Sequence, residues 1–160
     1  KRLTWENIVW EKGRVIANGL DAEKNIIVSD TIYSSEEPYA IVLNVEPLLS
    51  VKKKKFTRKA NGSDVAIITA KVVDVNGRLC SRADIPLTFE IEGVGEYCGS
   101  ANFYITEGKS IYYHTPGDKE LQSEGGIMRI AVKSTFEPGE VRISAYSFGL
   151  KSGETKLKFH

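Results

Sequence analysis

The sequence has few histidines, few cysteines and no long apolar run, and each shortage excludes a class of function. Its two histidines, His114 and His160, are too far apart in the chain to supply the clustered ligands of a zinc site. Cys80 and Cys98 match no metal-binding or redox spacing, so we expect two free, partly buried thiols rather than a disulfide. No stretch approaches the roughly 18 apolar residues of a membrane-spanning helix. We therefore expect no metal, no cofactor and no membrane span.

The excess of one sign of charge over the other is also small. The 160 residues carry 22 Lys and Arg against 21 Asp and Glu, a formal net charge of +1. A nucleic-acid partner would need a larger basic excess or a structured basic patch. The one basic run, at residues 52–55 with Arg58 and Lys59 behind it, is better interpreted as a charged strand edge that discourages aggregation. We expect no nucleic-acid partner.

Apolar residues instead alternate with polar ones, which predicts β-strands with one buried face each. Helical periodicity is almost absent, and turn signals such as Asn76-Gly77 recur at short intervals. Sheets with a single apolar face must pack against each other, so the sequence predicts an all-β, immunoglobulin-like β-sandwich. The clearest strands are expected around residues 65–74, 87–91, 128–133, 141–145 and 155–159.

The first 44 residues predict a second, smaller unit. Three strand candidates precede a polar break at residues 34–38, and an alternating apolar run at 41–45 follows it. Three or four strands rarely close a sandwich alone, so we expect this unit to be truncated at its N-terminus or to lean on a neighbour. We divide the chain into a partial unit at 1–44 and a complete sandwich at 45–160. The strand candidates are Leu3–Trp10, Arg14–Leu20 and Asn25–Tyr33.

Residues 100–126 interrupt the alternation with aromatic residues and Gly-rich turns. We expect a long connection there with one short strand around residues 111–113, and long loops on a rigid sandwich are where binding usually occurs. Its aromatic side chains could stack on sugar rings, or they could cover the end of the sandwich or dock on other domains, which we favour. The candidates for sugar or interdomain contact are Tyr97, Tyr104, Tyr112, Tyr113, His114 and, from the N-terminal unit, Trp10.

Two runs of the sequence carry a recognisable order of strands and turns. The first contains VVDVNGR at 72–78 and LTFEI at 87–91, and the second contains AVKST at 131–135 and VRISA at 141–145. This order resembles the C-terminal Ig-like domain of family 2 glycoside hydrolases of the β-galactosidase type. It is similar, more loosely, to the Ig-like domains of invasin-type bacterial adhesins. Residues 3–13 favour the hydrolases over the adhesins, because they resemble the end of the small β-domain that precedes the Ig-like domain in the hydrolases.

The resemblance implies a non-catalytic piece of an enzyme that hydrolyses O-glycosyl bonds with two glutamates. In that family the glutamates lie on an upstream (β/α)8 barrel, and no alternation of strands and helices occurs here. The acid/base glutamate of the family usually follows an asparagine, and this sequence has no Asn-Glu dipeptide. We therefore expect no catalytic residue in the chain.

The expected role is to brace the barrel or to make interdomain or oligomer contacts. Expected partners are the remaining domains of the same polypeptide, with carbohydrate and a second copy of the chain as further candidates. The resemblance implies a periplasmic or secreted bacterial protein. Two alternatives stay open, a carbohydrate-binding module and an adhesin-type stalk domain. Apolar surface that the parent covers should be exposed in this chain.

Overall fold

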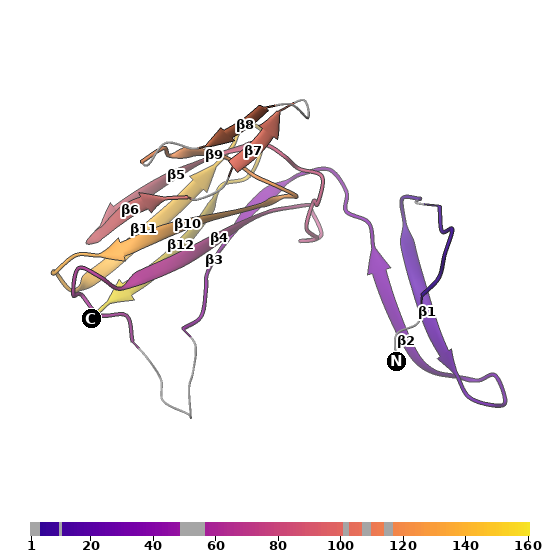
Figure 1. Ribbon diagram of the computed structural model, residues 1–160. Coiled ribbons are helices and arrows are strands. Elements are labelled where there is room, and N and C mark those ends of the chain that lie inside the picture. Colours follow the sequence, from indigo (N-terminus) through magenta and orange to yellow (C-terminus); the bar gives the residue numbers. More distant parts are fainter. Residues whose placement is uncertain (1–3, 10, 49–56, 101–102, 107–109, 114–116) are drawn as a thin grey trace. The chain divides into compact units, whose positions relative to one another are not determined.

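The computed structural model describes residues 4–9, 11–48, 57–100, 103–106, 110–113 and 117–160. For residues 103–106 and 110–113 it describes the backbone alone. The chain divides into two compact units, Lys1–Ser35 and Glu36–His160 (Figure 1). Every regular element in the described residues is a β-strand, which confirms the all-β prediction. No helix in these residues could cross a membrane.

The first unit contains one antiparallel hairpin. Its strands are β1, Arg14–Leu20, and β2, Ile26–Tyr33. Asp21 forms the turn between them, because its carboxylate accepts hydrogen bonds from the backbone N–H groups of Glu23 and Asn25. The two strands match the predicted ranges closely, since their alternation ends at polar turn residues on both sides.

A third strand in the first unit, predicted for Leu3–Trp10, is wrong for residues 4–9, which form no strand. Asn7 has a φ of 58°, which interrupts an extended backbone. Trp5 is 63% exposed and does not contribute to a core. Trp10 lies outside the described residues.

The second unit is a sandwich of two four-stranded antiparallel sheets (Figure 1). The first sheet has the order β3 (Ala40–Val45), β4 (Val65–Val73), β10 (Ile127–Ser134) and β6 (Gly95–Gly99). The second sheet has the order β12 (Gly153–Phe159), β11 (Gly139–Tyr146), β5 (Pro86–Gly93) and β9 (Glu120–Gln122). A separate hairpin pairs β7 (Phe103–Thr106) with β8 (Ser110–Tyr113).

The core lies between the two sheets, as the period-two pattern predicts. Alternate residues of β4, β5, β10, β11 and β12 point inward, so each sheet contributes one apolar face. Each large side chain that is fully buried stabilises the fold by about 1.5–3 kcal/mol. The largest are Phe89, Phe159, Ile68, Leu87, Leu121, Met128, Ile130 and Ile143.

Strand β3 belongs to the second unit, although we expected its residues to fall largely in the first. It pairs with β4 along its full length, and Ile41 and Leu43 are buried in the sandwich core. The Ile41 N–H also donates to the carbonyl of Lys151, next to β12. The two compact units therefore meet at 35/36, whereas the sequence suggested 44/45. The alternation located the strand, but it could not tell which sheet the strand would join.

The segment at 100–126 holds more structure than predicted. It contains β7 and β8 and also β9, which pairs with the start of β5. Sequence reasoning found one of these three strands, because their short lengths give little alternation to detect. Both thiols are free, as predicted, but neither is partly buried, because Cys80 is buried and Cys98 is exposed.

Candidate functional site

The predicted aromatic site is only partly visible. His114 and Trp10 lie outside the described residues, and the structure describes the backbone of Tyr104, Tyr112 and Tyr113 but not their side chains. Tyr104 is the register partner of Tyr112 across the β7–β8 hairpin. Consecutive residues of a strand alternate between faces, so Tyr112 and Tyr113 occupy positions on opposite faces. The hairpin therefore does not place these two positions on one flat aromatic platform.

Tyr97, the sixth aromatic candidate, has a structural role. It lies on β6, packs against the sandwich core, and donates its hydroxyl hydrogen bond to the carbonyl of Asp118. Burial, with a smaller contribution from the negative charge of Asp118, raises the pKa of Tyr97 to about 12. This hydrogen bond links β6 to the short segment that precedes β9. This phenol is therefore not available to a sugar.

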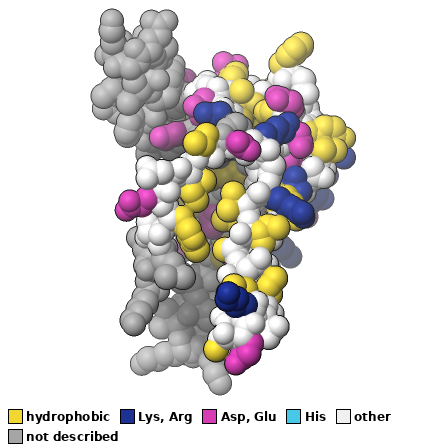
Figure 2. Space-filling model, turned by 90° about the vertical axis from the view of Figure 1, so that its right-hand side faces the viewer, with side chains coloured by type: hydrophobic (Ala, Val, Ile, Leu, Met, Phe, Trp, Pro, Cys, Tyr) yellow, Lys and Arg dark blue, Asp and Glu magenta, His cyan; other side chains and the backbone are white. Residues whose placement is uncertain are grey.

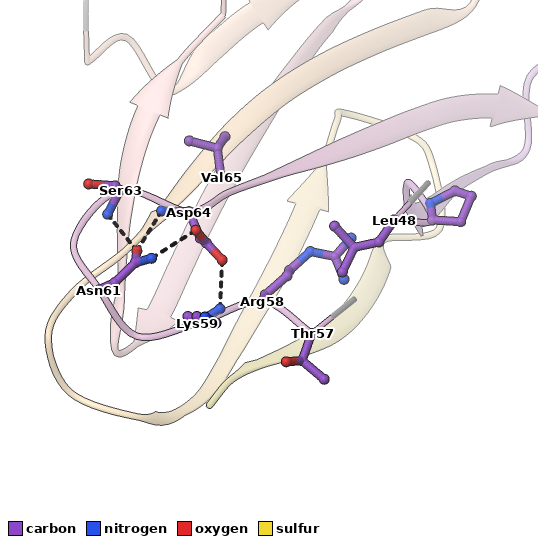
Figure 3. Close-up of a pocket in the computed structure, with 9 residues that line it drawn as sticks. Leu48, Thr57, Arg58, Lys59, Asn61, Ser63, Asp64 and Val65 are labelled. Carbon is purple, nitrogen blue, oxygen red and sulfur yellow. Dashed lines mark hydrogen bonds between the residues drawn. The ribbon is translucent and has the colours of Figure 1, made fainter. Parts of the chain in front are cut away.

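A wide hollow of about 740 Å³ lies beside the start of β4 (Figure 3). Its polar groups mostly satisfy one another. The Asp64 carboxylate accepts bonds from the Lys59 N–H and the Asn61 amide, and the Asn61 oxygen accepts from the N–H groups of Ser63 and Asp64. These bonds hold the pKa of Asp64 below its usual value. The Asp64 carboxylate thus acts as a structural anchor of the loop that leads into β4.

Arg58, which lines this hollow, has a buried polar atom without a hydrogen-bond partner among the described residues. Its Nη2 donates to the carbonyl of Glu46, while its buried Nε has no hydrogen-bond partner. No carboxylate that lines the hollow forms an ion pair with the guanidinium among the described contacts. The described hydrogen bonds of the hollow pair no nucleophile with a general base.

Polar side chains also cross the outer face of the first sheet. Arg129 Nε on β10 donates to Thr69 Oγ1 on β4 at 3.2 Å, and the Thr69 hydroxyl donates to a carboxylate oxygen of Glu46. Further along, Lys133 Nζ lies 2.7 Å from Glu96 Oε2, and this carboxylate raises the pKa of Lys133. The hydrogen bonds with Arg129 and Glu46 explain why Thr69 is buried, although it lies on the face of β4 that the alternation predicted to be exposed to solvent. Cross-strand bonds of this kind stabilise a sheet and leave no group to act on a substrate.

Buried Asp74 is a polar group whose role sequence analysis did not detect. It follows β4, and its Oδ1 accepts the N–H groups of Asn76 and Arg78. Its Oδ2 accepts the N–H of Glu36, the first residue of the second unit. Burial acts to raise its pKa, but the three hydrogen bonds outweigh this and the pKa of Asp74 is lowered. The signal in the sequence was an Asp two residues before an Asn-Gly turn.

The β1–β2 hairpin exposes apolar side chains on both of its faces. One face presents Val15, Val28 and Ile32, which are 59%, 62% and 71% exposed. The other face presents Ile16, Ile27 and Tyr33, also exposed. Figure 2 shows hydrophobic side chains open to the surface among charged ones. Soluble proteins rarely leave both faces of a two-stranded sheet this apolar, so the hairpin has the character of an interface.

Within the described residues, no three His, Cys, Asp or Glu side chains are grouped so as to hold a metal ion. Several described carboxylates satisfy neighbouring backbone groups or pair with exposed cations, as in Lys156–Glu140 on the second sheet at 2.9 Å. The exposed apolar faces of the β1–β2 hairpin are the candidate contact surface of the described residues.

The fold and this surface define an immunoglobulin-like β-sandwich region, preceded in sequence by a two-stranded apolar unit. The sequence model of glycoside hydrolase family 2 C-terminal domain 5 matches residues 49–156. The chain therefore belongs to glycoside hydrolase family 2, which confirms the resemblance and decides against the adhesin alternative.

The chain spans a small part of the length of the relatives that it matches. It is 34% identical over 156 residues to a β-glucuronidase of Formosa agariphila, covering 96% of this chain and 14% of that protein. It is 38% identical over 88 residues to a β-galactosidase of Thermoanaerobacter pseudethanolicus, covering 55% of this chain and 9% of that protein. Among solved structures, a family 2 β-glucuronidase superimposes with a TM-score of 0.76 and 31% identity over 98% of this chain and 15% of that one.

Proposed function

We propose that the chain is a non-catalytic C-terminal region of a bacterial family 2 glycosidase and that the β1–β2 hairpin attaches it to the rest of that enzyme. The main observation in support of this proposal is that the hairpin exposes apolar side chains on both faces. A hairpin alone is at best marginally stable in water, so its strands need a covering partner. Preceding parts of the same polypeptide are the proposed partner, because the chain spans only 14% of the β-glucuronidase it resembles.

The parent is proposed to hydrolyse O-glycosyl bonds, with its reacting carboxylates outside this chain. The relatives named as β-glucuronidase and β-galactosidase support the reaction class. The absence of a nucleophile–base pair among the described residues supports a bracing role. Bacterial relatives are compatible with a periplasmic or secreted parent, and that location stays a prediction.

The test compares the parent enzyme carrying Ile32→Asp with the unaltered enzyme. A charge on the covered face of β2 should speed thermal inactivation of aryl β-glycoside hydrolysis, because the hairpin can no longer be buried. Phe148→Asp is the matched control, since Phe148 is a fully exposed apolar residue in the loop between β11 and β12. Equal inactivation rates for both variants would contradict the attachment role. Turnover of a glycoside by the 160-residue chain alone would contradict the non-catalytic role.

A carbohydrate-binding role is the second candidate, favoured by the cross-strand partners Tyr104 and Tyr112. Titration with galactosides and plant glycans, followed by tyrosine fluorescence, tests it. Saturable binding that Tyr112→Ala or Tyr113→Ala removes would support the module. Tyr39→Ala is the control, because Tyr39 is an exposed tyrosine of the second unit outside this hairpin. If no glycan binds, or if Tyr39→Ala weakens binding equally, the module is excluded.

A further inference from the structure

Three Asn-Gly pairs occur in the chain, at 18–19, 61–62 and 76–77, and the fold restrains them differently. In such a pair the main-chain nitrogen of glycine can attack the side-chain carbonyl carbon of asparagine, since glycine has no Cβ to obstruct the approach. Reaction requires a free amide side chain and a backbone that can bend to form a five-membered ring. The contacts of each pair therefore predict which one reacts.

Asn18 is held within a strand. Its Oδ1 accepts a 2.8 Å hydrogen bond from the Ser29 hydroxyl on β2, and Gly19 pairs with Val28 in the ladder. In a strand the side chain points out of the sheet while the next N–H lies in the sheet plane, so the reacting atoms are kept apart. This pair is restrained as long as the hairpin is formed.

Asn61 is held more firmly. Its Oδ1 accepts the N–H groups of Ser63 and Asp64, and its Nδ2 donates to Asp64 Oδ1 at 2.9 Å. The Gly62 N–H donates to the carbonyl of Thr135 at 3.2 Å. The Phe136 ring covers Gly62, because a Cβ on that residue would meet a ring carbon at 2.8 Å. Reaction here would require all of these contacts to break.

Asn76 lacks these restraints. It lies in the exposed turn after β4, and its side-chain amide makes no hydrogen bond with a described residue. Gly77 has a φ of 77° and open space around the position of a Cβ. The one contact on the attacking nitrogen is a 3.0 Å bond from the Gly77 N–H to the carbonyl of Asp74. Asp74 Oδ1 also binds the backbone N–H groups of Asn76 and Arg78, so what Asn76 lacks is a partner for its side-chain amide rather than for its backbone.

We propose that Asn76 is a site of spontaneous deamidation. The Gly77 nitrogen loses its proton and attacks Cγ of Asn76, the C–N bond of the side-chain amide breaks, and ammonia leaves with a cyclic imide in place. Water then opens the imide at either carbonyl and gives an aspartyl or an isoaspartyl residue. No oxidant or reductant takes part. The isoaspartyl product inserts a methylene into the main chain beside Asp74, whose carboxylate holds the N–H of Glu36.

The experiment incubates the folded 160-residue chain at mildly alkaline pH and follows the three pairs by tryptic peptide mapping at low pH. Cleavage after Lys and Arg separates them into peptides 15–24, 60–71 and 72–78. Deamidation adds about 1 Da, because OH replaces NH2. Peptide 72–78 should gain this mass about tenfold faster than peptide 60–71, since Asn61 must first break additional hydrogen bonds.

Two controls make the result decisive. In denaturant the three peptides should react at similar rates, because unfolding removes the restraints on Asn18 and Asn61. Asn76→Gln keeps an exposed amide but requires a larger ring, so its peptide should keep its mass in the folded chain. The proposal is overturned if folded Asn76 reacts no faster than Asn61, or if the rate advantage of Asn76 persists in denaturant.

Discussion

Asp74 shows how one residue can join distant parts of the second unit. Its carboxylate receives three backbone N–H groups, from Glu36, Asn76 and Arg78, so it fastens the first residue of the unit to the turn between β4 and β5. Asp74→Asn removes one accepting oxygen and turns an NH2 group toward a donor. We expect the melting temperature of the second unit to fall by several degrees, measured by circular dichroism.

The same residue should contribute to the acid sensitivity of the fold. Because the folded-state pKa of Asp74 is lowered below 3.8, its stabilisation is present above that pH and is lost as pH falls through the folded pKa. The stability of the unaltered chain should therefore decline below about pH 4, and Asp74→Asn should flatten that decline. Glu92→Gln is the control, since Glu92 is an exposed carboxylate of β5 with no hydrogen bond to a described residue. If the stability of Asp74→Asn fell at acid pH as steeply as that of the unaltered chain, this role would be contradicted.

Tyr97 should act at the opposite end of the pH range. Its pKa is about 12 in the folded chain and near 10 when unfolded, so the folded state holds the proton more tightly. Stability from this group is complete below pH 10 and is lost as pH rises toward 12. We expect Tyr97→Phe to lack this alkaline decline, and absorbance titration to lose one late phenolate signal. A Tyr97→Phe variant with the same alkaline melting curve would show that another group is responsible.

At the scale of the element, alternation predicted the long strands well and the short ones poorly. β10 and β11 bury every second residue, so the order of apolar and polar residues sets their faces. β4 also buries Thr69 and Val73 on its opposite face. β9 has three residues, and its place beside β5 depends on hydrogen bonds that its sequence does not encode. The strand expected before β1 is not formed at residues 4–9. Asn7, which has a positive φ, interrupts the extended backbone there despite the apolar residues around it.

The junction between β3 and β12 is an element contact that the sequence left open. At Gly153, the first residue of β12, an added Cβ would lie 2.5 Å from the carbonyl oxygen of Ile41. Because that atom is backbone, Gly153→Ala must push β12 away from β3, at a cost of about 1–3 kcal/mol. Urea unfolding measures the loss. Ser152→Ala, one residue earlier and exposed, should change little, and equal effects would mean that the contact is not tight.

At the scale of the whole molecule, composition and turn spacing were enough to predict a sandwich with a partial unit before it. They could not locate the candidate contact surface, because Val15, Val28 and Ile32 look like ordinary core residues in the sequence. Only the hairpin's pairing shows that no described strand in its own unit covers them. The exposure of these residues is therefore visible only in the structure.

This division predicts how the chain unfolds. The second unit has its own core of buried residues, none of which comes from residues 1–35. Removing those residues should leave its melting temperature within about 3 °C of the full chain, measured by calorimetry. In hydrogen exchange the amides of β1 and β2 should be poorly protected in the 160-residue chain and well protected in the parent enzyme. A single cooperative transition that is lost on truncation, or equal protection of the hairpin in both contexts, would show that the hairpin is stabilised by the sandwich rather than by the parent.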